Sequence, residues 1–139
     1  MNQNSCFIDT GAFYASLDTR DQNHKRSLEI WEKLENTNIR LITSNHILDE
    51  LATLLARKIG YEFSALQMYE IYTDAEIHIE RSTHTDELKA LALFKKYADQ
   101  KISFTDCISF AIMERLNIQK VFGFDRHFRF SGFDLLSEQ

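Results

Sequence analysis

The sequence predicts an α/β fold with a central, mostly parallel sheet of four or five strands. Short apolar runs of strand length alternate along the chain with longer stretches that have a helical period. Strands that alternate with helices build parallel sheets with helices on their faces. The length of 139 residues fits one domain, residues 1–139, and we find no repeat, linker or low-complexity stretch.

Residues 6–8 form the first predicted strand, an apolar run that ends at Asp9. A helix opens directly after this strand, at Thr10. A second helix follows Asp21, and its apolar residues are spaced to form one buried face. The residues of that face are Leu28, Trp31 and Leu34.

The second strand is predicted over residues 39–43, where apolar and polar residues alternate. Ser44 or Asn45 then caps a third helix, and Gly60 provides its C-terminal stop. Apolar residues recur along this helix with the 3.6-residue period of a core-facing stripe. The stripe consists of Ile47, Leu48, Leu51, Leu54 and Leu55.

The middle of the chain supplies a helix over residues 62–72, an alternating strand over residues 75–80 and a helix over residues 85–98. We expect the last of these helices to turn one apolar face toward the core. That face consists of Leu88, Leu91, Ala92 and Phe94.

The last helix is predicted over residues 104–116, with Ser103 as its cap. It is apolar nearly all round, which is typical of a buried helix. Residues 121–124 then form a buried strand that ends at Asp125, and residues 133–136 form a final edge strand.

Composition indicates a globular cytoplasmic protein without a membrane segment. Apolar residues make up 44% and charged residues 27% of the chain. The apolar runs are far shorter than the roughly 20 residues that a membrane span needs, and the N-terminus does not resemble a signal peptide. Cys6 and Cys107 lack the spacing of metal ligands, so we interpret them as reduced thiols.

The formal net charge of −5 argues against a protein that holds nucleic acid by overall electrostatic attraction. It does not exclude binding through metal ions and a local basic patch. Candidate cations for such a patch are Arg20, Lys25, Arg26, Arg57, Lys58, Arg126 and Arg129. Most of them have a simpler interpretation as solvated charges. Arg126 and Arg129 are the best candidates for substrate contacts because they lie next to Asp125.

Three aspartates stand at informative positions. Asp9 and Asp125 each follow an apolar strand, and ligands of open α/β sheets bind outside the carboxyl ends of the strands. Taken singly, each has a simpler role in capping a helix or forming a turn. Asp106 lies on a buried helix, where its charge must be paired, capped or metal-bound. The alternative for Asp106 is a capping box with Ser103.

Glu50 lies at the core boundary of the third helix by its angular position, whereas Asp49 faces water. Alone, Glu50 has a simpler interpretation as a side chain that covers the core edge. If the four acids converge, each pair at ~4 Å costs roughly 4 kcal/mol at an effective dielectric near 20. A divalent cation relieves that repulsion, and a site made only of carboxylates suits Mg²⁺ or Mn²⁺. No pair of histidines has the spacing of metal ligands.

Four segments resemble the acidic motifs of the PIN domain, most closely those of bacterial VapC-like toxins. The segments are FIDTGAFYASL, SNHILDELATLL, SFTDCISFAIMERLNI and VFGFDRHF. They occur in the order of the family and span nearly the whole chain. The resemblance implies a three-layer α/β/α fold and an endoribonuclease that requires Mg²⁺ or Mn²⁺. It also implies a homodimer that cleaves RNA and is silenced by a cognate antitoxin protein.

Carried over by position, the resemblance implies one acidic quartet that is both catalytic and metal-binding. Its members are Asp9, Glu50, Asp106 and Asp125. Thr10 and Thr105 match polar residues that support the site.

Residues outside the quartet receive lesser roles. His24 matches a position that we interpret as structural, and His127 and Phe128 shape the loop after Asp125. Gly123 and Phe124 depart from the family pattern, in which a threonine commonly precedes the fourth acid.

Other functions stay open at this point. A strand that ends in Asp9 faintly resembles an aspartate-nucleophile phosphohydrolase, but those enzymes need a second aspartate where Gly11 stands. A PIN-like fold can also serve as a non-catalytic RNA-binding or assembly module. The sequence does not separate RNA from DNA, because recognition of the 2′-hydroxyl leaves no motif here.

Overall fold

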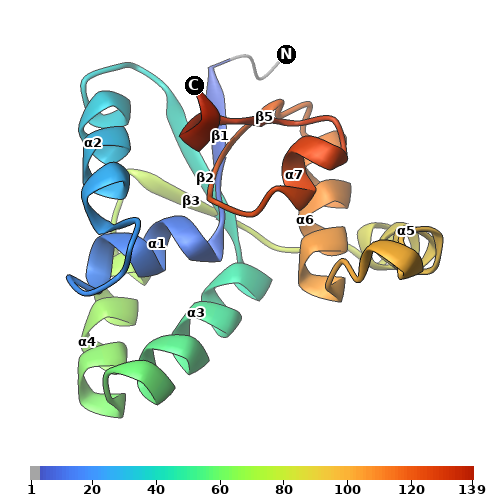
Figure 1. The fold of residues 1–139 in the computed structure, drawn as a ribbon. Helices are drawn as coiled ribbons and strands as arrows, with labels where there is room; N and C mark the ends of the chain where they lie inside the picture. The colour runs from blue at the N-terminus through green and yellow to red at the C-terminus, as the bar shows by residue number, and fades with distance from the viewer. Residues whose placement is uncertain (1–3) are drawn as a thin grey trace.

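The computed structural model describes residues 4–139 and contains one five-stranded sheet in the order β3-β2-β1-β4-β5, with every neighbouring pair parallel (Figure 1). The strands are β1 (Ser5–Ile8), β2 (Arg40–Ser44), β3 (Ile77–Glu80), β4 (Lys120–Phe122) and β5 (Asp134–Leu135). The α/β prediction is therefore confirmed, including the short edge strand near the C-terminus.

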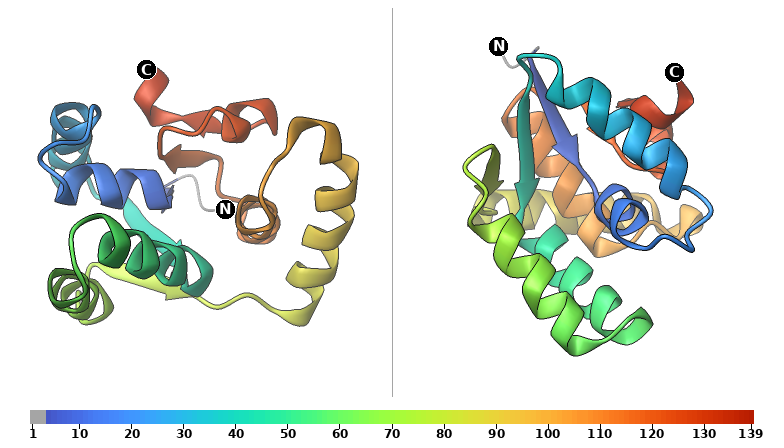
Figure 2. Two further views of the ribbon diagram at one scale, coloured as in Figure 1. Left: turned by 60° about the horizontal axis from the view of Figure 1, so that its bottom comes forward. Right: turned by 90° about the vertical axis from the view of Figure 1, so that its left-hand side faces the viewer.

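Helices form a layer on each face of the sheet. They are α1 (Thr10–Leu17), α2 (His24–Glu35), α3 (Asn45–Lys58), α4 (Tyr61–Tyr72), α5 (His84–Lys96), α6 (Phe104–Arg115) and the short α7 (His127–Phe130), with 3₁₀ turns η1 (Ala98–Gln100) and η2 (Leu136–Glu138). Helices α1 to α4 cover one face, α6 and α7 cover the other, and α5 packs on the outside of α6 (Figure 2). No helix within residues 4–139 is both long and apolar enough to cross a membrane.

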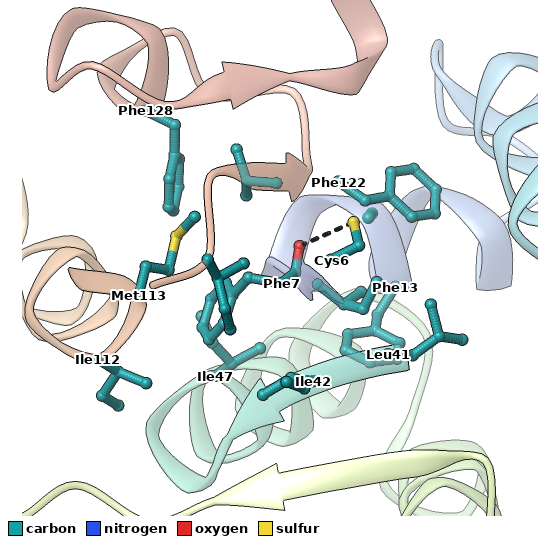
Figure 3. Close-up of a cluster of buried hydrophobic side chains, with 14 of the residues drawn as sticks. Cys6, Phe7, Phe13, Leu41, Ile42, Ile47, Ile112, Met113, Phe122 and Phe128 are labelled. Atoms are coloured by element: carbon teal, nitrogen blue, oxygen red, sulfur yellow. Dashed lines mark hydrogen bonds between the residues drawn. The ribbon is translucent and has the colours of Figure 1, made fainter. Parts of the chain in front are cut away.

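The core lies where the helices meet the three central strands, β2, β1 and β4. Phe7, Ile42 and Phe122 of the sheet pack with Ile47 of α3 and Met113 of α6 (Figure 3). Parallel strands buried on both faces read as continuous apolar runs, as residues 6–8 and 121–122 do, whereas β2 alternates apolar and polar residues. The two cysteines are free and buried, as predicted, and burial raises the pKa of the Cys6 thiol to about 12.

The strand order creates a switch point beside β1. The chain leaves β1 toward β2 on one side and later returns to β4 on the other side. Crossovers that diverge in this way leave a crevice at the carboxyl ends of the strands, where ligands of open α/β sheets bind. Asp9 follows β1, and Asp125 follows β4 after two intervening residues, so β4 ends earlier than predicted.

The predicted inward face of α5 is wrong. Leu88, Leu91 and Phe94 are 53%, 52% and 45% exposed, and Ala92 is also exposed, whereas Asp86 and Ala90 are buried. Helix α5 packs mainly against α6, through the side that carries the small Ala90. Asp86 is buried there because it pairs with Arg115 of α6.

A smaller correction concerns α2, where Leu28 is 47% exposed. Ser27 is buried instead, and its hydroxyl donates to the carbonyl of Ala12 in α1 at 2.9 Å. The small side chain and its hydrogen bond let α2 approach α1 closely. Ile30 and Leu34 complete the buried side of α2, and Leu54 of α3 is only half-buried.

Candidate metal centre

Asp9 is a buried carboxylate with an unused oxygen. It directly follows β1 and is 5% exposed. It occupies the N-cap position of α1 without a regular side-chain cap hydrogen bond, although the backbone N–H groups of Thr10 and Gly11 lower its pKa. Within residues 4–139, its Oδ1 atom is buried and has no hydrogen-bond partner. The Oδ1 oxygen is therefore free to bind a ligand.

Gly123 allows β4 to end against Asp9. A Cβ atom at position 123 would lie 2.9 Å from the Asp9 Cβ and 3.2 Å from its Oδ2. The backbone N–H of Asp9 also donates to the Phe122 carbonyl at 2.9 Å. The glycine that departs from the family pattern is thus required by the close approach of the Asp9 side chain.

Asp106 lies in the first turn of α6 and is 7% exposed. The Ser103 hydroxyl accepts a hydrogen bond from the Asp106 N–H at 3.1 Å, so the predicted cap is confirmed. A complete capping box forms in α5, between Thr83 and Asp86, but the structure shows no such reciprocal bond at Ser103 within residues 4–139. The carboxylate of Asp106 is therefore not consumed by the cap.

Asp125 and His127 join Asp106 at the end of the sheet. The His127 N–H donates to Asp125 Oδ1 at 2.9 Å, which is the turn role considered for Asp125. His127 Nδ1 lies 3.1 Å from the same oxygen and 3.8 Å from Asp106 Oδ2. One potential ligand atom from each of the three residues lies within 4.8 Å of the others. His127 was expected only to shape the loop, so sequence reasoning missed its place in the centre.

Glu50 reaches the centre through Thr10. The Thr10 hydroxyl donates to Glu50 Oε1 at 2.5 Å, which ties the second turn of α3 to the first turn of α1. Glu50 is exposed, so its predicted place at the core boundary is wrong. Thr105, at the start of α6, borders the same cleft as Thr10 and Glu50.

Neighbouring carboxylates act on the charges of Asp9 and Asp106. Burial raises the pKa of Asp9, and the charges of Glu50 and Asp125 raise it further. Burial also raises the pKa of Asp106, to which the charges of Asp9, Asp125 and Glu50 add. The repulsion predicted from convergence is therefore present in the folded chain.

Several other predicted residues lie outside this cluster. Arg129 is 3.5 Å from Glu138 of η2, and Arg126 is exposed at the start of α7. His24 Nδ1 lies 2.7 Å from the Ala15 carbonyl, in line with the structural role expected for it. Phe128, the buried residue of α7, packs edge-on against Phe110.

The residues present fit a divalent metal ion. Asp9 offers a buried oxygen without a partner, and Asp106 and Asp125 offer further carboxylate oxygens beside the His127 imidazole. A donor set dominated by carboxylate oxygen favours hard cations such as Mg²⁺ or Mn²⁺. A bound cation would offset the repulsion that raises the pKa values of Asp9 and Asp106.

Comparison with known proteins finds relatives that are named as nucleases. The family model described as PIN domain matches residues 6–131. The 23S rRNA-specific endonuclease VapC20 of Mycobacterium tuberculosis is 30% identical over 127 residues, which are 91% of this chain and 94% of the relative. A VapC ribonuclease of Archaeoglobus fulgidus is 34% identical over 134 residues, covering 89% of this chain and 79% of the relative.

Solved structures agree with the sequence comparison. The crystal structure of M. tuberculosis VapC20, described as a sarcin–ricin loop cleaving toxin, superposes with a TM-score of 0.85 at 28% identity and covers 92% of this chain and 95% of that one. A toxin–antitoxin complex from Klebsiella pneumoniae contains a chain of the same fold, with a TM-score of 0.57 at 14% identity and 87% of each chain covered.

Proposed function

Since the chain belongs to the PIN domain family, we propose that it is a metal-dependent endoribonuclease and the toxin of a toxin–antitoxin pair. The observation that carries this proposal is the convergence of acids from four separate segments. The members of the acidic quartet are Asp9, Glu50, Asp106 and Asp125, and the charges of Glu50 and Asp125 raise the pKa of both Asp9 and Asp106 at the carboxyl edge of the sheet. The names of the VapC relatives support RNA as the substrate.

Mg²⁺ or Mn²⁺ is the proposed cofactor, and such an ion, when bound, polarises a phosphodiester and neutralises the charge that develops on it. Asp9 and Asp106 are held by burial, so they would present their oxygens to the ion without reorganising. Asp125 is fixed by the N–H of His127, and Glu50 is fixed by the hydroxyl of Thr10. The chain therefore orients all four carboxylates before substrate arrives.

Cleavage of RNA in Mn²⁺ or Mg²⁺ tests the function. A synthetic hairpin with the sequence of the sarcin–ricin loop is the first substrate to try, because a relative is described as cutting that loop. We expect cleavage by the wild type, and loss of cleavage in excess chelator and in Asp106→Asn with the fold retained by circular dichroism. Full activity of Asp106→Asn, or cleavage in chelator, would overturn the proposal. A folded protein that binds but never cuts RNA would favour the non-catalytic binding module.

An antitoxin protein is the proposed regulatory partner, because a relative with 28% identity is described as a toxin. Co-expression with the product of any small neighbouring gene tests this proposal. We expect a stable complex in which RNA cleavage is suppressed. Undiminished cleavage in the presence of that product contradicts its role as antitoxin.

A homodimer is also proposed, with the exposed face of α5 as its surface. Leu88, Leu91 and Phe94 form an apolar face that is about half exposed within residues 4–139, and Phe94 also contacts Phe104 of α6 at its edge. The first turn of α5 is acidic and its last turn is basic, so two copies that pack antiparallel around a two-fold axis would match charges. Light scattering should find a dimer for the wild type and a monomer for Leu91→Glu. A dimeric Leu91→Glu protein excludes this surface.

A further inference from the structure

A cleft of about 560 Å³ opens along α3 beside the candidate metal centre. This volume lies within the usual range for ligand-binding pockets. Three of its lining residues, Thr10, Glu50 and Thr105, also border the metal centre. The remaining lining residues have no role in that centre and are His46, Asp49, Thr53, Leu54 and Arg57.

The cleft follows one face of α3. Its lining residues on that helix recur at three- and four-residue spacing from position 46 to position 57, which places them on one side. His46 stands one turn before Glu50. Arg57 stands two turns after Glu50, about 10 Å along the helix axis. Glu50 therefore lies between an imidazole and a guanidinium along the same track.

Charge differs along this track. Among the described residues that line the cleft, Arg57 carries the one permanent positive charge, and the structure shows no ion pair for it within residues 4–139. Asp49 and Glu50 make the middle of the cleft negative. A phosphate is therefore favoured at the Arg57 end, and it is favoured in the middle only when a divalent cation accompanies Glu50.

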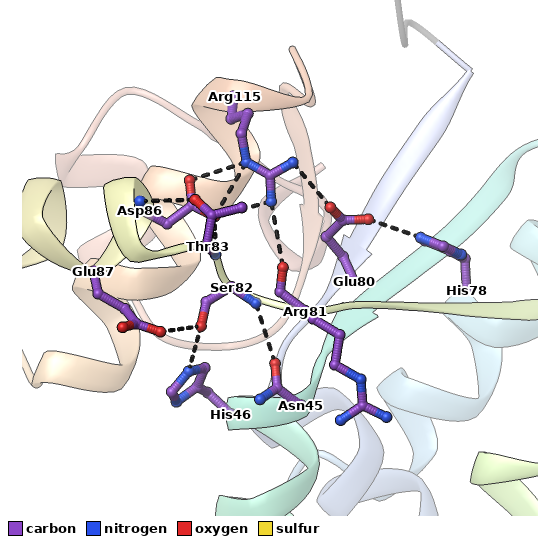
Figure 4. Close-up of polar contacts among 10 residues, drawn as sticks. All are labelled: Asn45, His46, His78, Glu80, Arg81, Ser82, Thr83, Asp86, Glu87 and Arg115. Carbon is purple, nitrogen blue, oxygen red and sulfur yellow. Dashed lines mark hydrogen bonds and ion pairs between the residues drawn. The ribbon is translucent and has the colours of Figure 1, made fainter.

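His46 is held in a defined orientation by a relay of hydrogen bonds (Figure 4). The Ser82 hydroxyl donates its single proton to Glu87 Oε2 at 2.7 Å. His46 Nε2 lies 2.8 Å from the same hydroxyl, so Nε2 must carry the proton and donate it to Ser82. Within residues 4–139, no hydrogen-bond partner is found for Nδ1, which leaves that nitrogen available to a ligand.

The segment that carries Ser82 is itself anchored. Arg115 binds Glu80 at 2.9 Å and Asp86 at 2.9 Å, and it donates to the Arg81 carbonyl at 3.5 Å (Figure 4). Ser82 is therefore held from both sides in the sequence. The relay to His46 is already ordered, so ligand binding loses little conformational entropy there.

We propose that this cleft binds the backbone of a single-stranded RNA segment adjacent to the scissile phosphate. Arg57 binds a backbone phosphate at one end, and His46 hydrogen-bonds a nucleotide at the other. Proteins that recognise RNA sequence bind unpaired segments, so we assign a single strand to this cleft. This inference rests on the proposed function, because the metal centre defines where the scissile phosphate lies.

Arg57→Gln, with Lys58→Gln as matched control, tests the phosphate contact. Both variants remove one positive charge from the end of α3, but Lys58 lines a different hollow, with Asp18 and Phe63. Steady-state cleavage of a labelled single-stranded oligoribonucleotide is measured across a salt series. For Arg57→Gln we expect KM to rise about tenfold with kcat retained. The slope of log(kcat/KM) against log[salt] should flatten by about 0.7, the value for one phosphate contact in a single strand.

The outcomes separate this inference from the proposed function. Equal KM values and salt slopes for the two variants would contradict RNA binding in the cleft and would leave the proposed ribonuclease function intact. If the wild type does not cleave, fluorescence anisotropy with the same oligoribonucleotide in Mg²⁺ or Mn²⁺ measures binding alone. Binding that depends on Arg57 then supports the cleft without the nuclease, and absence of binding overturns both.

His46 is tested by a double-mutant cycle with Ser82. We expect Ser82→Ala and His46→Gln each to raise KM severalfold, and the double variant to show no further increase, because Ser82 acts only through the imidazole. Additive effects, or no change in KM for His46→Gln, would remove His46 from the proposed contact.

Discussion

At the scale of single residues, Asp9 and Asp106 are costly for this fold to keep. Each is buried, and each has a raised pKa because burial and neighbouring carboxylates disfavour its charge. One oxygen of Asp9 also has no hydrogen-bond partner among the described residues. Residues kept at such cost are typical of functional sites. A metal ion that binds these oxygens accounts for both features.

Gly123→Ala tests the packing that positions Asp9. The added methyl group would lie 2.9 Å from the Asp9 Cβ, so the carboxylate must shift. We expect RNA cleavage to fall at least tenfold and stability to fall by about 1–3 kcal/mol, the usual cost of overpacking. Gly11→Ala is the control, because its methyl group would make only ordinary contacts with Phe124, the nearest at 3.9 Å. Similar activity in the two variants would contradict the role assigned to Gly123.

Site residues could be predicted from the sequence where a single residue departs from the pattern of its helix. Asp106 was identifiable because a carboxylate interrupts a helix that is apolar nearly all round, and the structure places it in the cluster. His127 was missed because its position depends on the four-residue α7, which is too short to show a period. Glu50 could not be placed by its helix alone, since the hydroxyl of Thr10 from another helix determines where it points.

At the scale of elements, the ends of β1 and β4 position Asp9 and Asp125, and helix α6 positions Asp106. Apolar runs at residues 6–8 and 121–124 and alternating patterns at residues 39–43 and 75–80 located the four longer strands, because each buried face of a sheet needs apolar residues. The orientation of α5 could not be predicted in the same way. Its exposed stripe of Leu88, Leu91 and Phe94 is more apolar than the side that is buried, which carries Asp86 and Ala90. Asp86 is buried against Arg115 of α6, and this contact depends on how the two helices pack, which the sequence pattern of α5 does not show.

Arg115→Ala tests the link between α5 and α6. Burial alone would raise the pKa of Asp86, but the hydrogen bonds from Arg115 hold that pKa below its usual value. Removing the guanidinium leaves a buried carboxylate unpaired, and we expect a loss of about 3 kcal/mol in the free energy of unfolding. Lys89→Ala removes an exposed pair with Glu114 of the same two helices and should cost less than about 1 kcal/mol. Urea denaturation compares the two, and equal losses would contradict the role of Arg115.

At the scale of the whole molecule, a net charge of −5 coexists with a proposed RNA substrate. A metal ion in the proposed centre and Arg57 in the cleft would supply positive charge where the phosphates bind. RNA binding should therefore depend strongly on divalent ions and only modestly on monovalent salt. The parallel sheet brings residues more than a hundred positions apart to one edge, as with Asp9 and Asp125. Their convergence was predictable because each aspartate follows an apolar strand. The strand order, which places β1 beside β4, was not predicted.

The pH dependence of stability should report the acidic cluster. The pKa values of Asp9 and Asp106 are raised in the folded chain, so the folded state binds more protons than the unfolded state above about pH 4. The free energy of unfolding of the metal-free protein should therefore fall as pH rises through neutrality. Asp106→Asn should flatten this decline and stabilise the metal-free protein by about 1–2 kcal/mol at neutral pH. Urea denaturation in chelator measures both, and an unchanged pH profile would contradict the assignment.

Binding of Mn²⁺ by isothermal titration calorimetry tests most directly whether the four acids form one metal centre. We predict a saturable site in the wild type whose affinity falls at least tenfold in Asp9→Asn and in Asp106→Asn, with circular dichroism unchanged. Asp134→Asn, at the far edge strand, serves as the control and should bind as the wild type does. Wild-type affinity in both Asp9→Asn and Asp106→Asn, or no binding by the wild type at millimolar Mn²⁺, would contradict the metal centre.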